Sequence, residues 1–167
     1  MDPCFRSITP LAILLVLIVA TDLFANEGNE GDAKTWNTYH SAMQMSRQTG
    51  RPVMLVFSGS DWCSWCRRLE SEVLRTQQFS TWAEANVLAV YVDFPQGHML
   101  PTALAQQNEQ LKQRFSAHVQ YYPTVLFVNA NQQVIGKMGF VEGGPDDWIQ
   151  QAQAFASKTR IKQKYEK

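Results

Sequence analysis

Residues 51–70 read "RPVMLVFSGSDWCSWCRRLE" and contain two of the chain's three cysteines, Cys63 and Cys66. The first part is a continuous apolar run with branched side chains, which predicts a strand buried on both faces. Gly59 ends that run, and Ser60 or Asp61 can cap a helix that begins near the cysteines. The pair therefore lies where a buried strand passes into a helix.

This position suits thiol chemistry, because the thiolate and not the thiol is the nucleophile. The first turn of a helix offers unpaired backbone N–H groups and the positive end of the helix dipole, which lower the pKa of a cysteine there. We expect Cys63 to be this nucleophile. Cys66 lies one turn deeper on the same face, where it can attack a mixed disulfide at Cys63. A Cys-x-x-Cys pair at a strand-to-helix junction indicates a redox centre.

Other uses of the pair fit the sequence less well. A disulfide that closes so short a loop removes little entropy from the unfolded chain, so a structural role is weakly motivated. A structural zinc site needs four N or S ligands, whereas His40, His98 and His118 are scattered singly. A cysteine protease would not use a second cysteine at this spacing. We therefore expect neither a metal nor an organic cofactor.

The segments around the pair alternate between helices and strands. Upstream, Trp36, Tyr39 and Met43 stand at helical spacing, and Gly50 ends that helix. Downstream, the helix at the cysteines carries three apolar residues on its buried side: Leu69, Val73 and Leu74. Residues 87–94 read as a second buried strand, and residues 104–115 as a helix.

The C-terminal part reads as a hairpin followed by a helix. Residues 122–140 contain two apolar runs joined at Asn129-Ala130-Asn131, which predicts two antiparallel strands. Pro145 at a first helical position, with Asp146 and Asp147 behind it, opens a helix whose inner face includes three residues: Trp148, Ala152 and Phe155. The whole order predicts an α/β fold with a central mixed sheet of four to five strands and helices on both faces.

The N-terminal residues read as an export signal. Arg6 precedes a short apolar stretch, residues 11–20, and the small residue Ala25 offers a cleavage position. The alternative is an uncleaved anchor, but a helix needs about 20 apolar residues to span a bilayer. We expect a signal peptide over 1–25, with Cys4 inside it, and export to the periplasm or the medium.

The rest of the chain divides into three parts. Residues 26–33 form a Gly- and Asn-rich flexible leader, residues 34–158 the folded domain, and residues 159–167 a basic tail. Overall, fifteen Lys and Arg balance fifteen Asp and Glu, so no electrostatic footprint for nucleic acid is present. We expect a monomer that binds no nucleic acid.

Three features resemble the thioredoxin superfamily, over about residues 35–156. "WCSWC" (62–66) is similar to its active site, "YYPT" (121–124) to its cis-proline loop, and Gly139 to the glycine of its substrate groove. The stretch 51–70 looks most like exported thioredoxin-like proteins and the C-terminal reductase domain of the interchange protein DsbD. The resemblance implies a thioredoxin fold with a redox-active Cys63–Cys66 disulfide.

The same resemblance implies how partners are bound. Trp62, Tyr122, Pro123 and Gly139 are the expected substrate-binding residues, with Pro123 in a cis peptide bond beside Cys63. The substrates would be protein thiols and disulfides. In an oxidising compartment, a reductase of this kind needs a membrane or exported redox partner that keeps it reduced.

The chain departs from the thioredoxin pattern at three places. Val56 stands where thioredoxins have a buried acid near the resolving cysteine, and one extra residue precedes Trp62. Ser71 stands where many thioredoxins have a helix-kinking proline. Asp61 and Glu70 are nearby, and we expect both to be solvated. The proton acceptor for Cys66 therefore does not follow from the resemblance, and neither does the redox potential.

The sequence leads to one main functional hypothesis and two alternatives. The main one is an exported thiol-disulfide oxidoreductase in which Cys63 attacks a protein disulfide and Cys66 resolves the intermediate. The first alternative is a thioredoxin-fold adaptor or holdase with a pair that does not cycle, motivated by the missing buried acid. The second is an exported dithiol protein that handles metal.

Overall fold

A computed structural model describes the backbone of residues 36–165 and side chains as far as Lys158. The expected signal peptide (1–25) and leader (26–33) lie outside the described residues, as do the last two residues of the expected tail. The first half contains α1 (Tyr39–Thr49), β1 (Val53–Ser58), α2 (Ser64–Leu69), the π-helical turn η1 (Glu70–Leu74), α3 (Gln77–Asn86) and β2 (Leu88–Asp93). The second half contains α4 (Thr102–Arg114), β3 (Thr124–Val128), β4 (Val134–Met138) and α5 (Gly144–Tyr165).

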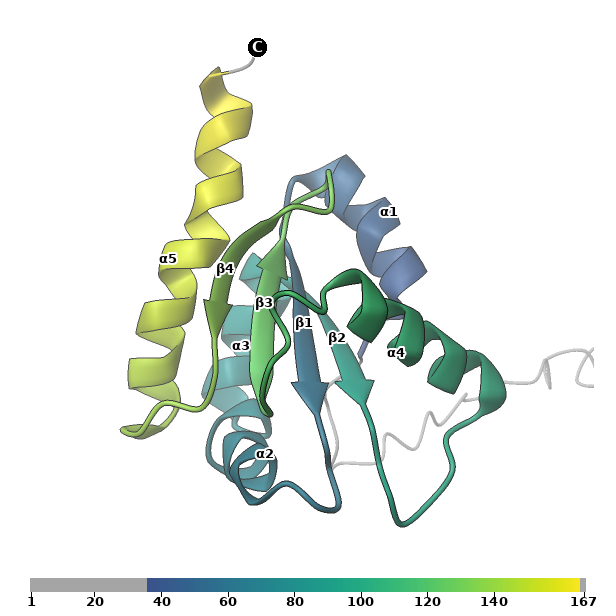
Figure 1. The fold of residues 1–167 in the computed structure, drawn as a ribbon. Coiled ribbons are helices and arrows are strands. Elements are labelled where there is room, and N and C mark those ends of the chain that lie inside the picture. The colour runs from purple at the N-terminus through teal and green to yellow at the C-terminus, as the bar shows by residue number, and fades with distance from the viewer. Residues whose placement is uncertain (1–35, 166–167) are drawn as a thin grey trace, which may run out of the picture. The chain divides into compact units, whose positions relative to one another are not determined.

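The four strands form one mixed sheet in the order β2-β1-β3-β4, as Figure 1 shows. β1 pairs in parallel with β2, and β3 is antiparallel to both β1 and β4. The C-terminal ends of β1 and β2 therefore lie beside the start of β3, and we call this end of the strands the sheet edge. This arrangement confirms the predicted mixed sheet with a C-terminal hairpin and helix.

Each face of the sheet has its own hydrophobic cluster. Met54 and Val56 of β1 face a cluster that includes buried residues of α2, η1, α3 and α5, among them Leu69, Phe79 and Trp148. The alternate β1 residues face a second cluster with α1 and α4, built on Leu55, Phe57, Ala42, Met43 and Leu111. Side chains alternate between the faces of a strand, so a run that is apolar throughout is buried on both sides.

The first helix is shorter than its apolar spacing predicts. It begins at Tyr39, because the side chain of Thr38 accepts a hydrogen bond from the Ser41 N–H and caps it. Trp36 lies before the helix, and its ring packs on that of Tyr91 with centroids 4.9 Å apart. Gly50 ends the helix as predicted, with a φ of 68° that favours glycine.

Between β1 and β2 the structure has three helical segments where the sequence predicts one helix. After α2, the N–H of Arg75 bonds to the carbonyl of Glu70, five residues back, so η1 is a π-helical turn. The Ser71 hydroxyl, at the position of the thioredoxin proline, bonds to the Arg67 carbonyl at 2.9 Å. α3 then begins behind Thr76, whose side chain caps it.

The last helix, α5, begins at Gly144, one residue before Pro145. Trp148 and Ala152 are buried on its inner face, whereas Phe155 is only partly buried. The helix continues past residue 158 to Tyr165, so the backbone of the expected tail is largely helical. In the part of the chain that the structure describes, no helix is long and apolar enough to cross a membrane.

Candidate active site

Cys63 and Cys66 form a disulfide at the start of α2, at the sheet edge where β1 ends. Cys63 is itself the N-cap of the helix, and its sulfur accepts a hydrogen bond from the Cys66 N–H at 3.2 Å. The expected cap at Ser60 or Asp61 is therefore wrong, because the loop extends to Cys63 before the helix begins. Both cysteines are buried, with 7% of Cys63 and 2% of Cys66 exposed.

The predicted cis peptide bond is present between Tyr122 and Pro123. Pro123 directly precedes β3, and Thr124 of β3 pairs with Phe57 of β1. The proline therefore lies at the sheet edge where residues 59–63, which we call the active-site loop, begin. Gly139 packs closely behind it, because a Cβ on Gly139 would lie 3.2 Å from the Pro123 carbonyl oxygen. The Trp148 indole donates a hydrogen bond to the Gly139 carbonyl and holds it there.

Trp62 covers the outer side of the active-site loop. Its indole lies over Gly59, where an added Cβ would overlap the ring. The indole N–H donates to the Phe94 carbonyl at 2.8 Å, and the ring meets that of Tyr122 edge-on with centroids 5.5 Å apart. Since 42% of Trp62 is exposed, the side chain forms a wall of the site and is not a core residue.

Two carboxylates connect the active-site loop to the end of β2 and to the loop that follows β2. Asp93, buried at the end of β2, accepts hydrogen bonds from the backbone N–H and the hydroxyl of Ser60, at 2.9 and 2.6 Å. Asp61 accepts from the backbone N–H groups of Gln96 and Gly97, and these bonds hold the pKa of Asp61 below its ordinary value. We call Ser60, Asp61, Asp93, Gln96 and Gly97 the loop clamp.

The hydrogen bonds of Asp93 to Ser60 do not follow from any motif in the sequence. One signal for them exists: Asp93 is a charged residue that closes an apolar strand parallel to β1. The carboxyl ends of neighbouring parallel strands meet at one edge, so a polar side chain there reaches the next loop.

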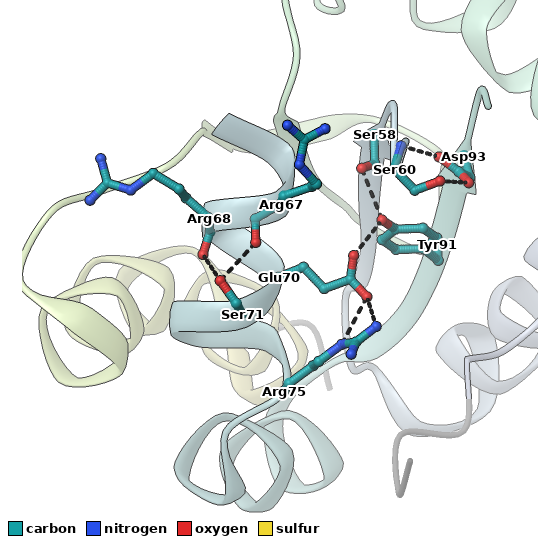
Figure 2. A network of polar contacts seen from close by, with 9 residues as sticks. All are labelled: Ser58, Ser60, Arg67, Arg68, Glu70, Ser71, Arg75, Tyr91 and Asp93. Carbon is teal, nitrogen blue, oxygen red and sulfur yellow. Dashed lines mark hydrogen bonds and ion pairs between the residues drawn. The ribbon is translucent and has the colours of Figure 1, made fainter. Parts of the chain in front are cut away.

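A second polar network joins the C-terminal end of α2 to β1 and β2 (Figure 2). The Tyr91 hydroxyl lies 2.9 Å from Ser58 Oγ and 3.3 Å from Glu70 Oε2, and Glu70 also pairs with Arg75 at 2.9 Å. Burial, the largest cause, raises the pKa of Tyr91 well above its ordinary value. Glu70 is one turn beyond Cys66, since its N–H bonds to the Cys66 carbonyl.

This network changes one expectation from the sequence. Glu70 was expected to be solvated, but its side chain is only 26% exposed and its carboxylate is hydrogen-bonded to Tyr91, whereas Asp61 is exposed as expected, although its carboxylate accepts backbone hydrogen bonds. Val56, at the position of the thioredoxin acid, is buried in the apolar cluster. The carboxylate one turn beyond Cys66 is thus that of Glu70, at the end of α2, and its hydroxyl partner Tyr91 comes from β2.

Aromatic and cationic side chains border the disulfide. Trp65, between the two cysteines, is 50% exposed, and its ring lies 5.6 Å from that of Phe140. The guanidinium of Arg68 lies over both rings, at 5.1 and 4.6 Å from their centroids. Among the described residues, no three His, Cys, Asp or Glu side chains gather in a way that would hold a metal ion.

Two curated proteins of Chlamydia pneumoniae are similar to this chain. The first, named disulfide bond reductase DsbH, is 35% identical over 109 residues, which are 65% of this chain and 64% of that protein. The second, named thioredoxin-related protein DsbJ, is 27% identical over 135 residues, which are 80% of this chain and 38% of that protein. The chain thus matches less than two thirds of the length of either relative.

Solved structures agree with the fold. A structure titled DsbH oxidoreductase is 31% identical and superposes with a TM-score of 0.70, covering 74% of this chain and 85% of that one. The oxidised C-terminal domain of DsbD from Neisseria meningitidis is 18% identical with a TM-score of 0.51, covering 69% and 90%, and shows a shared fold.

A protein family described as the thioredoxin-like domain matches residues 39–153, which is more than half of the chain. The match begins with α1 and ends within α5, so it includes the sheet, the disulfide and the cis-proline loop. The resemblance expected from "WCSWC" and "YYPT" is confirmed, and this chain belongs to the thioredoxin-like domain family.

Proposed function

We propose that this protein is a thiol-disulfide oxidoreductase that acts on protein substrates. The observation that carries the proposal is the Cys63–Cys66 disulfide at the start of α2, at the same sheet edge as the cis-proline loop. A cysteine at a helix N-terminus is favoured as a thiolate, and a partner one turn away can displace it from a mixed disulfide. The 35% identity to a protein named disulfide bond reductase supports the same activity.

The proposed reaction has two exchange steps. In the reduced protein, the Cys63 thiolate attacks a client disulfide, forms a mixed disulfide and releases the first client sulfur as a thiolate. The thiolate of Cys66 then attacks the Cys63 sulfur, closes the Cys63–Cys66 disulfide and releases the second client sulfur. Two electrons pass from the cysteine pair to the client, and the client thiolates take up the protons that the two cysteines lose.

Trp62, Tyr122, Pro123 and Gly139 are the proposed client-binding residues. Trp62 and Tyr122 meet edge-on at the site, and Gly139 supports Pro123 from behind. The backbone of Tyr122, which precedes β3, can then pair with an extended client segment, as in recognition by β-strand addition.

We propose the reducing direction and an exported location. The name of the 35% identical relative supports the direction, and the signal-like residues 1–25 support export. Exported disulfides persist because the compartment is oxidising, so a reductase there must be kept reduced by a dithiol partner in or at the membrane.

The test is disulfide reduction by the purified chain and by its Cys63→Ser and Cys66→Ser variants. The wild type should reduce a protein disulfide, Cys63→Ser should be inactive, and Cys66→Ser should accumulate a mixed disulfide visible on a non-reducing gel. Equilibration with glutathione should give a potential closer to about −270 mV than to −120 mV. A pair that fails to cycle would contradict the proposal and favour the adaptor alternative.

A further inference from the structure

Lys137 on β4 carries a positive charge that no carboxylate of the described residues neutralises. None of the ion pairs found in the described part of the chain includes it. Its ammonium group lies instead over the ring of Tyr121, 4.7 Å from the ring centroid, in a cation–π contact. Lys137 is partly buried, whereas 52% of Tyr121 is exposed. We call these two residues the lysine–tyrosine pair.

The strand register places Lys137 on one particular face of the sheet. Lys137 pairs with Leu126 of β3, and Leu126 belongs to the hydrophobic cluster on the face that α1 and α4 cover. Side chains directly opposite each other in an antiparallel pair lie on the same face, so Lys137 is on that face as well. Tyr122 packs against the same cluster. The lysine and the start of the cis-proline loop therefore share one side of the sheet.

Measured contacts connect the lysine–tyrosine pair to the proposed client-binding residues. A Cβ on Gly139 would lie 3.8 Å from Tyr121 Cε2 and 3.2 Å from the Pro123 carbonyl oxygen. Tyr121 thus lies close to the same glycine that supports the cis-proline. The Tyr122 ring in turn meets the Trp62 ring, with centroids 5.5 Å apart, and joins the cis-proline loop to the cysteine motif. The pair therefore adjoins the cis-proline side of the site.

Other cations that border the site have partners within the protein. Arg67 donates to a backbone carbonyl of the active-site loop at 3.0 Å, and Arg68 pairs with Glu72 at 2.8 Å. Lys112 has Glu109 three residues before it on α4, a spacing at which side chains are neighbours on a helix. Among these described cations, the lysine of the pair is the one whose charge is left for an acidic group from outside the protein.

Resting on the proposed function, we propose that the lysine–tyrosine pair binds an acidic side chain, Asp or Glu, of the client polypeptide a few residues from its reactive cysteine. A client segment that pairs with the backbone of Tyr122 is extended and advances about 3.3 Å per residue, so its next residues pass beyond Pro123. A carboxylate there can pair with the Lys137 ammonium while its methylene groups contact the Tyr121 ring. The pair thus selects polypeptide clients by charge and has no role with small neutral disulfides.

The test uses a series of peptide disulfides in which one position, within about four residues of the cysteine, is Glu, Gln or Lys. At low ionic strength, the reduced wild type should react about three-fold faster with the Glu peptide than with the Gln peptide at one position, as expected for one exposed ion pair. The Lys peptide should be the slowest at that position. Because salt screens exposed charges, about 0.5 M NaCl should remove most of the difference.

Charge reversal distinguishes a charge contact from a structural effect. In Lys137→Glu the preference should invert, so that the Lys peptide reacts faster than the Glu peptide, and Lys137→Arg should keep the wild-type preference. The matched control is Arg47→Glu, which makes the same change of net charge on α1. Arg47 is exposed near the end of that helix, which leads into the start of β1 and not towards the cysteines, so the preference should not change.

The outcomes separate failure of this inference from failure of the proposed function. If the wild type reduces the peptides but does not distinguish Glu from Lys at any position, the inference is wrong. It is also wrong if Arg47→Glu shifts the preference as much as Lys137→Glu does. If Lys137→Glu does not fold, the preference of the wild type and its loss in salt decide the question. If the wild type reduces none of the peptides, the oxidoreductase function itself is wrong.

Discussion

The carboxylate of Asp93 at the end of β2 accepts two hydrogen bonds from Ser60, one from the backbone N–H at 2.9 Å and one from the hydroxyl at 2.6 Å. Asp93 is 8% exposed, and the Asn108 side chain donates to its backbone carbonyl at 2.9 Å. One residue thus joins the active-site loop, the second strand and α4. The position of the cysteines depends on a contact between segments more than thirty residues apart.

Replacing Asp93 should destabilise the protein. In Asp93→Ala the Ser60 N–H and hydroxyl lose their buried acceptors, which should cost about 2 kcal/mol in the free energy of unfolding. Asp93→Asn keeps one acceptor oxygen and should cost about half as much. Urea unfolding of the oxidised protein measures both, with the exposed Glu84→Gln as a control expected within about 0.5 kcal/mol of wild type. Equal stability of Asp93→Ala and wild type would contradict this role.

The Asp61 part of the loop clamp should depend on pH. Backbone hydrogen bonds from Gly97 and Gln96 lower the pKa of Asp61 from 3.8, so the folded state favours the carboxylate. Its contribution to stability is present above the unfolded pKa and is lost as the pH falls through the lower folded pKa. Hydrogen exchange of the Gln96 and Gly97 amides should therefore remain protected at neutral pH and lose protection below pH 3.8.

The matched control for this prediction is Asp61→Asn, which removes the titrating group and keeps one acceptor oxygen. The two amides should then be less protected at neutral pH, and their protection should no longer change as Asp61 would titrate. A wild-type protein whose protection did not change in acid would show that the carboxylate does not hold the loop.

The fold was largely predictable because its signals are local. The runs 53–57 and 87–92 are apolar throughout, as parallel strands covered on both faces must be, and Gly50 and Gly143-Gly144 mark breaks. The π-helical turn was not predictable. An uninterrupted α-helix would bury the same three residues that the observed α2 and η1 bury: Leu69, Val73 and Leu74. Their spacing therefore does not reveal that one turn of the helix is π-helical.

Only those residues of the site that belong to a short sequence motif were predictable. Cys63, Cys66 and Pro123 follow from short sequence patterns, and the structure brings them to one sheet edge. Asp93 of β2 bonds to Ser60 in the active-site loop, and Tyr91 of β2 bonds to Glu70 at the end of α2. In each case the two partners are distant in the sequence. Their partners depend on the register of β1 with β2, which pairs Ser58 with Asp93, and no local pattern fixes that register.

The buried Tyr91 should make stability fall in alkaline solution. Burial raises the pKa of Tyr91 above its ordinary value of 10.0, so the unfolded chain loses this proton at a lower pH than the folded protein does. The stabilising contribution is complete below pH 10.0 and decreases as the pH rises above it. Urea unfolding at pH 8 and at about pH 10.5 measures this decrease.

Tyr91→Phe provides the comparison, since Tyr39 and Tyr122 also have raised pKa values and contribute to the same decrease. At pH 8 the free energy of unfolding of the variant should be about 1 kcal/mol lower than that of wild type, because Ser58 and Glu70 lose a hydrogen-bond partner. Between pH 8 and about pH 10.5, the free energy of unfolding should then decrease less for the variant than for wild type. An equal loss would mean that the Tyr91 phenol ionises as easily in the folded protein as in the unfolded chain.

Adding a methyl group at Gly59 should displace Trp62. The Cβ of Gly59→Ala would overlap the indole ring, and moving the ring breaks its hydrogen bond to the Phe94 carbonyl. We expect a loss of about 1–3 kcal/mol in stability and a change in tryptophan fluorescence. Trp62→Phe separates the two effects, since it removes the bond and keeps most of the ring. Unchanged fluorescence in Gly59→Ala would show that the indole does not rest on this glycine.

The two cysteines should differ in reactivity once the disulfide is reduced. Cys63 caps α2, where the helix dipole and the Cys66 N–H favour its thiolate, whereas Cys66 lies within the helix and is only 2% exposed. Iodoacetamide at pH 7 should therefore modify Cys63 at least about ten-fold faster than Cys66. Peptide mapping of partly alkylated protein measures the ratio, and unfolding in urea should bring it close to one. Equal reaction at both positions would contradict the assignment of Cys63 as the attacking thiol, and faster reaction at Cys66 would reverse it.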